Sequence, residues 1–178
     1  MAMAEIPLTR PDTASMLRVD QAGEFGATRI YAGQRAIMGD RHPASRLIAR
    51  MATQEQAHRA RFDEMMAARG VSPTLLTPVW NVAGFALGAA TALIGPEAAM
   101  ACTAAIETEI DRHYGEQLNE IGDHDPELRE AIEQFREEEV EHRDTAIAAG
   151  AERAPAYPLL SAAIRIGCRA AITLSKRI

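Results

Sequence analysis

Two Glu-x-x-His motifs are the strongest chemical signal among the five histidines of the chain. Glu55 precedes His58 by three residues, and Glu139 precedes His142 by the same interval. Because residues three apart share one face of a helix, each motif can present a carboxylate and an imidazole to the same metal ion. The chain contains 17 glutamates, so two such motifs alone are only mildly surprising.

Two further glutamates lie where a helical hairpin would bring them opposite these motifs. In an antiparallel hairpin, residues equidistant from the turn lie at the same height. Counting back from the first motif through a turn near residues 40–42 reaches Glu24, and counting back from the second through a turn near 123–124 reaches Glu107. Each hairpin therefore offers one glutamate opposite one Glu-x-x-His motif, roughly 24 Å from its turn at 1.5 Å rise per residue.

The two halves of the chain repeat these positions. All three pairs of candidate ligands are separated by 83 or 84 residues, and Tyr31 and Tyr114 each follow the lone glutamate of their half by seven. The repeat predicts a duplicated hairpin in which every helix contributes to one metal site. Two glutamates plus two Glu-x-x-His motifs are the ligand set of ferritin-like di-iron and di-manganese bundles, and oxygen and imidazole donors suit iron or manganese.

The surroundings of the lone glutamates favour burial. Glu24 lies among small residues that allow close helix packing, and Glu107 follows nine uncharged residues, 98–106, where an unpaired carboxylate would be costly. His42 and His124 fall in predicted turns and are not expected to bind metal. Other glutamates of the acidic helix are expected on its solvated face, namely Glu137, Glu138 and Glu141.

Two residues are candidates for a catalytic role, although a structural role is equally open. Tyr114 lies two turns after Glu107 on nearly the same face, so its hydroxyl can point into the bundle, and His113 precedes it. We expect Tyr114 to take part in reduction or substrate positioning, with His113 near enough to assist proton movement. Tyr31, which has no neighbouring histidine, is expected mainly to support packing.

Helix start and stop signals predict six helices and no sheet. Alanine, the best helix former, occurs 35 times, and only 4% of residues are aromatic. We expect an all-α, ferritin-like four-helix bundle made of two antiparallel hairpins, with an extra apolar helix between them and a C-terminal helix. The predicted ranges, punctuated by proline and glycine, are about 11–38, 43–70, 78–94, 96–122, 126–150 and from Pro155 or Pro158 to the end.

Length and charge narrow the class further. The 178 residues, 47% of them hydrophobic, suit one domain spanning 1–178, with residues 1–10 expected to be flexible. A net charge of −6 argues against nucleic-acid binding. Cys102 and Cys168 form no disulfide framework and are expected to pack in a reducing compartment. The first residues have no secretory signal pattern, which favours a cytoplasmic protein.

Long sequence strings resemble the demethoxyubiquinone hydroxylases of ubiquinone biosynthesis. The resemblance covers nearly the whole chain from about residue 16 and includes the run from Arg18 to Gln34 (RVDQAGEFGATRIYAGQ). Further strings lie at Trp80–Ala89, Ala99–Thr103, Glu139–His142 and Ala154–Tyr157. The resemblance implies that His113 and Tyr114 lie close to the site. It also implies that six residues hold two iron ions: Glu24, Glu55, His58, Glu107, Glu139 and His142.

The resemblance implies an O₂-dependent hydroxylase of a polyprenylated quinone or quinol ring. Such an enzyme needs an external reductant, either NADH acting directly or a separate reductase. One alternative is a ferritin-like protein that oxidises iron or handles peroxide without an organic substrate. Another is a non-catalytic, membrane-associated scaffold in which the six residues form an inert polar network.

An uncharged stretch runs from Val71 to Pro96 and contains the predicted helix 79–94. This helix, about sixteen residues long, is short for a bilayer span and is either a buried core helix or an interfacial one. Gly84, Gly88 and Ala92 form a small-residue stripe for close helix packing. The C-terminal helix adds basic residues that suit an anionic lipid surface: Arg165, Arg169, Lys176 and Arg177. We therefore expect peripheral attachment to the cytoplasmic side of the inner membrane, with a lipid-binding or biosynthetic-complex protein as a possible partner.

Overall fold

The computed structural model describes residues 12–177, which form helices and short turns without a strand. The all-α prediction is confirmed. The expected flexibility of residues 1–10 concerns positions outside the described range. The helices are α1 (Thr13–Met38), α2 (Pro43–Arg69), α3 (Thr77–Ile94), α4 (Pro96–Ile121), α5 (Pro126–Ala148) and α6 (Tyr157–Ser175), with a short 3₁₀ turn, η1 (Ala151–Arg153), before α6.

Local sequence signals explain where these helices begin and end. The Asp12 side chain accepts a hydrogen bond from the Ser15 backbone N–H at 3.0 Å, and Asp125 does the same for Leu128 at 3.1 Å. Proline occupies the first turn of α2 through α6, where its missing N–H costs nothing. Gly70 ends α2 in the left-handed conformation that favours glycine, with φ of 64°.

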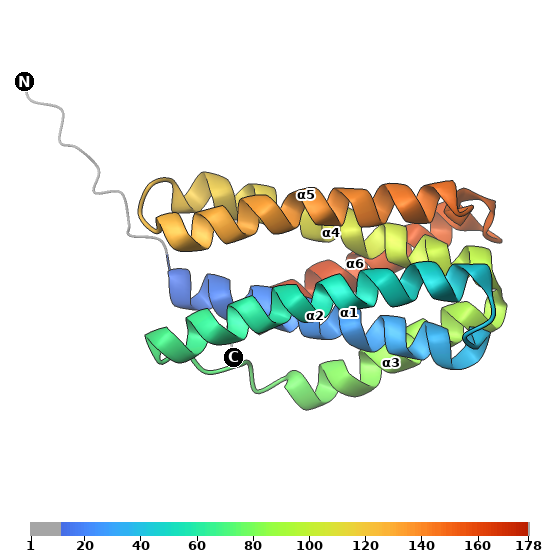
Figure 1. The fold of residues 1–178 in the computed structure, drawn as a ribbon, viewed down its shortest axis with the longest axis horizontal. Coiled ribbons are helices and arrows are strands. Elements are labelled where there is room, and N and C mark those ends of the chain that lie inside the picture. Colours follow the sequence, from blue (N-terminus) through green and yellow to red (C-terminus); the bar gives the residue numbers. More distant parts are fainter. Residues whose placement is uncertain (1–11, 178) are drawn as a thin grey trace, which may run out of the picture.

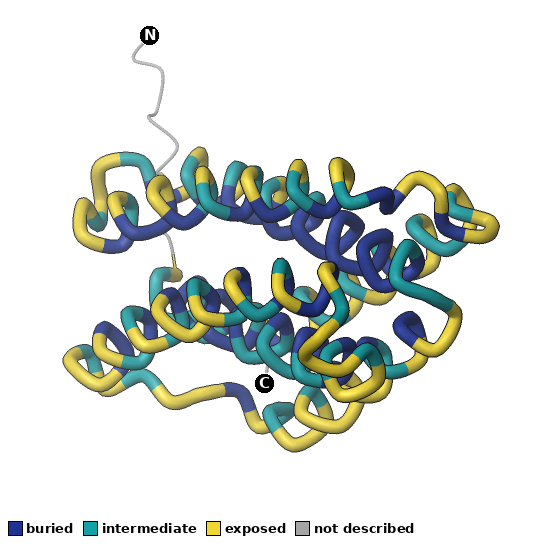
Figure 2. Tube along the Cα trace, turned by 45° about the vertical axis from the view of Figure 1, so that its right-hand side comes forward, coloured by how far each residue is buried: buried dark blue, intermediate teal, exposed yellow. Residues whose placement is uncertain are grey.

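Two hairpins, α1–α2 and α4–α5, make up the bundle (Figure 1). The α4–α5 hairpin lies above the α1–α2 hairpin in this view, α3 runs along α1, and α6 packs against α4. The buried faces of the hairpins turn toward each other, with exposed residues outside (Figure 2). Apolar residues form two clusters, one around Phe62 and Phe135 and one around Ile48 and Met100, and on α2 and α5 the candidate ligands fall between them.

The backbones of α1 and α3 lie unusually close together. A Cβ atom added to Gly88 would lie 1.9 Å from the carbonyl oxygen of Ile30, and one added to Gly33 would lie 2.1 Å from that of Phe85. The expected close packing of the small-residue stripe is thus confirmed, and its partner is α1. Only four residues of α3 are buried: Gly84, Gly88, Thr91 and Ala92.

The other face of α3 is exposed and apolar. Val82 is 69% exposed and Leu93 is 71% exposed, so the alternative of a buried core helix is wrong. The helix has 18 residues and a mean hydropathy of 1.3, and it is the one described helix whose length and composition would allow it to cross a membrane. Core helices of soluble proteins can meet the same two criteria.

Candidate metal centre

The structure brings all six candidate ligands together in the bundle interior. Ligand atoms lie within 4.8 Å of one another in each of two overlapping groups, and every member is buried. Glu24, Glu55, His58 and Glu139 form the first group; Glu55, Glu107, Glu139 and His142 form the second. Helices α1, α2, α4 and α5 each contribute, as the repeat in the sequence predicts.

The two overlapping groups could hold two neighbouring metal ions. Glu55 and Glu139 belong to both groups, so their carboxylates lie where each could bridge two ions. The remaining residues divide between a Glu24/His58 position and a Glu107/His142 position.

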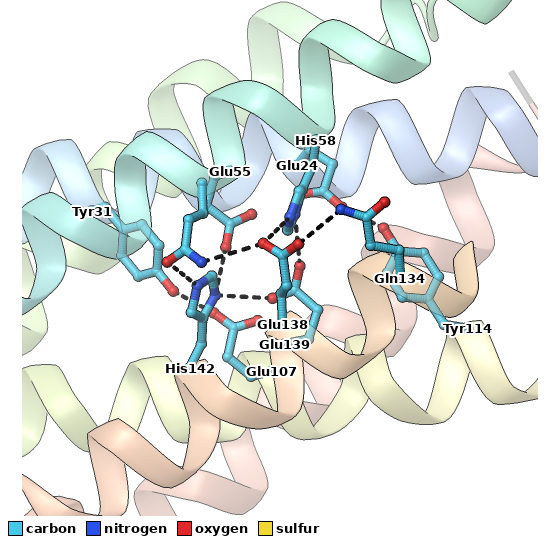
Figure 3. Close-up of polar contacts among 11 residues, drawn as sticks. Glu24, Tyr31, Glu55, His58, Glu107, Tyr114, Gln134, Glu138, Glu139 and His142 are labelled. Atoms are coloured by element: carbon cyan, nitrogen blue, oxygen red, sulfur yellow. Dashed lines mark hydrogen bonds and ion pairs between the residues drawn. The ribbon is translucent and has the colours of Figure 1, made fainter. Parts of the chain in front are cut away.

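Both histidines turn Nδ1 toward the carboxylates. Nδ1 of His58 lies 3.1 Å from Glu139 and 3.5 Å from Glu24, while Nδ1 of His142 lies 3.0 Å from Glu55 and 3.2 Å from Glu139 (Figure 3). Nδ1 is therefore the atom that each imidazole can offer to a metal. The second ring nitrogen, Nε2, is left to hold the proton.

The proton-bearing nitrogens face two residues that the sequence analysis did not assign. Nε2 of His58 lies 3.0 Å from Oε2 of Glu138, and Nε2 of His142 lies 3.1 Å from Oε1 of Gln54. The prediction that Glu138 is only a solvated surface residue is therefore wrong: its side chain is 28% exposed and accepts a hydrogen bond from His58. Burial alone would raise the pKa of Glu138, but the hydrogen bonds from His58 and Gln134 outweigh burial. The pKa is therefore lowered, which keeps this carboxylate ionised. Gln54 and Glu138 are 84 residues apart, the interval of the repeat, and this signal could have revealed both.

Each of the two tyrosines makes a hydrogen bond from one hairpin to the other. The Tyr114 hydroxyl donates to Oε1 of Glu24, and the Tyr31 hydroxyl donates to Oε1 of Glu107 (Figure 3). Burial, followed by the charge of the glutamate that each one contacts, raises the pKa of both tyrosines, so both remain protonated donors. Tyr31 consequently makes the same kind of polar contact as Tyr114, which the expectation of a mainly packing role did not include.

The cluster holds less positive charge than its four buried carboxylates would need. Burial and then the nearby Glu139 carboxylate raise the pKa of both Glu55 and Glu107. Burial alone would raise the pKa of Glu139, but hydrogen bonds with His142 and His58 outweigh it and lower this pKa to about 2. Burial alone would lower the pKa of His58, but hydrogen bonds with Glu139 and Glu24 outweigh it and raise this pKa to about 11. These shifts show a strong demand for cations or protons inside the cluster.

Several buried carboxylate oxygens also make no hydrogen bond with the described residues, namely both oxygens of Glu55 and Oε2 of Glu24 and of Glu107. Oε1 of Glu55 and Oε2 of Glu24 have only an ion-pair contact, with Nδ1 of His142 at 3.0 Å and Nδ1 of His58 at 3.5 Å. Buried polar atoms of this kind are normally satisfied, and metal ions would satisfy them here. Four carboxylates and two imidazoles form a donor set suited to a pair of iron or manganese ions.

His113 lies near the cluster, paired with a third residue that the sequence analysis missed. Its Nε2 atom lies 3.2 Å from Oδ1 of Asp20, one helical turn before Glu24 on α1. Both side chains are buried, and burial raises the pKa of Asp20. The ring of His113 lies 6.1 Å from that of Tyr114. The spacing of Asp20 and Glu24 on one helix face is the sequence feature that could have indicated this pair.

An apolar cavity of about 540 Å³ lies between α1, α3, α4 and α6 and reaches the cluster. Its lining is largely aliphatic, with a polar region formed by Asp20, Glu24, His113 and Tyr114. Of the six candidate ligands, only Glu24 lines this cavity. The cavity therefore meets the metal centre at the Glu24/His58 position.

The bundle gathers four carboxylates and two imidazoles in its interior, which is the donor set found in proteins that hold paired metal ions between helices. Comparison with known proteins identifies the family. Residues 11–175 match the family described as ubiquinone biosynthesis protein COQ7, and the chain belongs to it.

Curated relatives agree with this assignment. The chain is 54% identical over 162 residues to the 3-demethoxyubiquinol 3-hydroxylase of Rhodospirillum rubrum, a match that covers 91% of this chain and 76% of the relative. It is 48% identical over 175 residues to the mitochondrial NADPH-dependent 3-demethoxyubiquinone 3-hydroxylase of Homo sapiens, covering 96% and 80%. It is 42% identical over 179 residues to the mitochondrial 5-demethoxyubiquinone hydroxylase of Saccharomyces cerevisiae, covering 92% and 77%. The resemblance inferred from the sequence is thus confirmed.

Proposed function

We propose that the protein is a monooxygenase that uses O₂ to hydroxylate the ring of demethoxyubiquinone or demethoxyubiquinol. The six clustered residues would hold two iron ions, and Glu55 and Glu139 belong to both groups of candidate ligands. When bound, the iron pair would supply the redox chemistry that activates O₂. Electrons would come from an external reductant, either NADH directly or a reductase; several mitochondrial relatives are named NADPH-dependent.

The observation that carries this proposal is the apolar cavity that ends at Glu24. Its aliphatic walls suit a prenyl tail, and its polar region suits a quinone or quinol ring. A protein that only oxidises iron or handles peroxide would have the same ligands but no use for this cavity. The cavity therefore favours an organic substrate over that alternative.

Residues of the polar region would bind and orient the ring. Tyr114 and His113 line the cavity, and Tyr114 also holds the Glu24 carboxylate through its hydroxyl. Asp20 orients His113 through the hydrogen bond to Nε2, so the imidazole can hold or move a proton at a ring oxygen. The aliphatic walls would exclude water from the reacting ring.

Peripheral membrane attachment would give access to such a lipid substrate. The outer face of α3 and part of α6 expose large apolar side chains, including Val82, Leu93, Leu159 and Ile166. Arg165 and Arg169 pair with Glu109 of α4 at 2.6 and 2.9 Å, and their side chains remain 37% and 49% exposed. They would therefore add to any attraction that Lys176 and Arg177 exert on anionic lipid. We propose the cytoplasmic face of the inner membrane as the location; the exposed apolar face could equally contact a lipid-binding or biosynthetic-complex protein.

Product analysis tests the proposed function. Iron-loaded protein is incubated with reductant, ¹⁸O₂ and a short-tailed demethoxyubiquinone, and the quinones are analysed by mass spectrometry. We expect a ring-hydroxylated product that carries one labelled oxygen atom. Iron oxidation or peroxide consumption without this product would instead support the alternative function, and a chain that binds no iron would support the scaffold.

A further inference from the structure

The metal centre is nearly symmetric, but its outer hydrogen bonds are not. Every inner residue has a counterpart of the same type in the other half of the chain, tyrosines included. The acceptors of the two histidine protons break this rule. His58 faces the carboxylate of Glu138, whereas His142 faces the amide of Gln54.

These two acceptors belong to one hydrogen-bonded row where α2 faces α5. The amide nitrogen of Gln54 donates to Oε2 of Glu138 at 3.2 Å. Gln134 donates to Oε1 of Glu138, also at 3.2 Å (Figure 3). With His58, three donors converge on the Glu138 carboxylate. The row therefore holds both imidazole rings in place. It gives His58 a charged carboxylate as its partner and gives His142 a neutral amide.

A carboxylate and an amide act differently on a metal-binding imidazole. A carboxylate that accepts the Nε2 proton pulls it outward and makes Nδ1 a stronger donor to the metal. A neutral amide oxygen fixes the ring but polarises it less. The difference falls on opposite metal positions, because His58 serves one position and His142 serves the other.

We propose that Glu138 and Gln54 are positioning residues that make the two metal positions unequal. The Glu24/His58 position, backed by Glu138, binds the first ion more tightly, and the Glu107/His142 position binds the second more weakly. The tighter position is also the one that meets the apolar cavity, so the firmly held ion faces the substrate. This inference rests on the proposed function only in assuming that the six residues bind metal.

Isothermal titration calorimetry, in which ferrous iron is added anaerobically to the metal-free protein, measures both binding steps. In the unmodified protein we expect two separate steps. Glu138→Gln should weaken the tighter step by about 10- to 100-fold, the usual effect of losing such an outer partner. Gln54→Glu should instead tighten the weaker step. Glu141→Gln removes the same charge from an exposed position on the same helix and should change neither step.

The exchanged double variant, Gln54→Glu with Glu138→Gln, separates the hydrogen-bond effect from overall charge. It keeps the net charge and can re-form the bond between the two side chains with donor and acceptor reversed. We expect the order of the two positions to invert. Glu24→Ala and Glu107→Ala assign the steps: the first should remove the tighter step in the unmodified background and the weaker step in the double variant, and the second should do the opposite.

Specific results would overturn the inference. Equal steps in the unmodified protein, a Glu138→Gln variant with unchanged steps, or a double variant with the original order would each contradict it. Failure of every variant and of the unmodified protein to bind iron would contradict the metal assignment itself. Circular dichroism of each variant shows whether the helices are retained, and Gln54→Glu tests the inference separately if Glu138→Gln does not fold.

Discussion

Replacing each tyrosine of the centre with phenylalanine separates a shared structural role from a role in turnover. The change keeps the ring and removes only the hydroxyl. Tyr31→Phe takes the donor from Oε1 of Glu107, and Tyr114→Phe takes the donor from Oε1 of Glu24. The second oxygen of each glutamate already has no hydrogen-bond partner among the described residues, so each variant leaves a buried carboxylate less satisfied than before.

The structural cost should be similar for the two variants. A hydrogen bond contributes about 0.5–1.5 kcal/mol to stability between neutral groups and about 1.5–3 kcal/mol when one group is charged. In a chain of this size, each kcal/mol shifts the melting temperature by about 2–4 °C, so each metal-free variant should melt about 1–12 °C lower. Differential scanning calorimetry of the metal-free proteins measures this loss.

The effect on turnover should differ, because only Tyr114 lines the apolar cavity. If its hydroxyl also orients the ring in the transition state, losing about 1.5 kcal/mol slows hydroxylation about tenfold. Tyr31→Phe should retain nearly full turnover. Hydroxylation under saturating reductant, with iron counted on the same sample, compares the variants. Equal rates at equal iron content would refute a special role for Tyr114.

Three further expectations concern the helices around the centre. Val82→Asp combined with Leu93→Asp should release the protein from anionic vesicles in a flotation assay. Helix content should be retained, because both side chains are exposed. Unchanged flotation would contradict a lipid-facing α3. Gly88→Ala should destabilise the protein by about 1–3 kcal/mol in chemical unfolding, since its Cβ would meet the α1 backbone at 1.9 Å. Gly167→Ala, whose Cβ meets nothing within 4 Å, should not destabilise it, and equal losses would refute the close approach. Burial opposes ionisation of Glu109, but hydrogen bonds from three arginines lower its pKa from 4.5 to about 2. The stabilisation of α6 by ionised Glu109 should therefore be complete above pH 4.5 and fade as the pH falls toward 2. Glu109→Gln should remove this pH dependence of the free energy of unfolding, and an unchanged pH profile would contradict the role of the pairing.

The sequence could predict the inner residues of the centre because their positions follow from local geometry. Helix periodicity places Glu55 and His58 on one face, and equal distances from a turn place Glu24 opposite them. Proline and glycine fixed most helix boundaries to within about two residues for the same local reason. An interval of 83 or 84 residues then predicted the second half from the first.

The outer partners depend on how helices rotate against one another, which no local pattern determines. Glu138 lies in a run of three glutamates, and although the repeat interval relates it to Gln54, only the packing of α5 against α2 shows that it contacts His58. The pairing of Arg165 with Glu109 likewise requires α6 to dock on α4. The cavity depends on the packing of four helices at once.

In the proposed function, six residues of the protein would hold two iron ions, and the protein would hydroxylate a quinone ring. Iron content and ring hydroxylation, measured on the same samples of the unmodified protein and of the Glu107→Ala and His142→Ala variants, test it most directly. We expect close to two iron ions per chain and labelled product from the unmodified protein. Each variant should bind less iron and form no product, since each lacks a ligand of the Glu107/His142 position. Full iron content together with full hydroxylation in either variant would contradict the assignment.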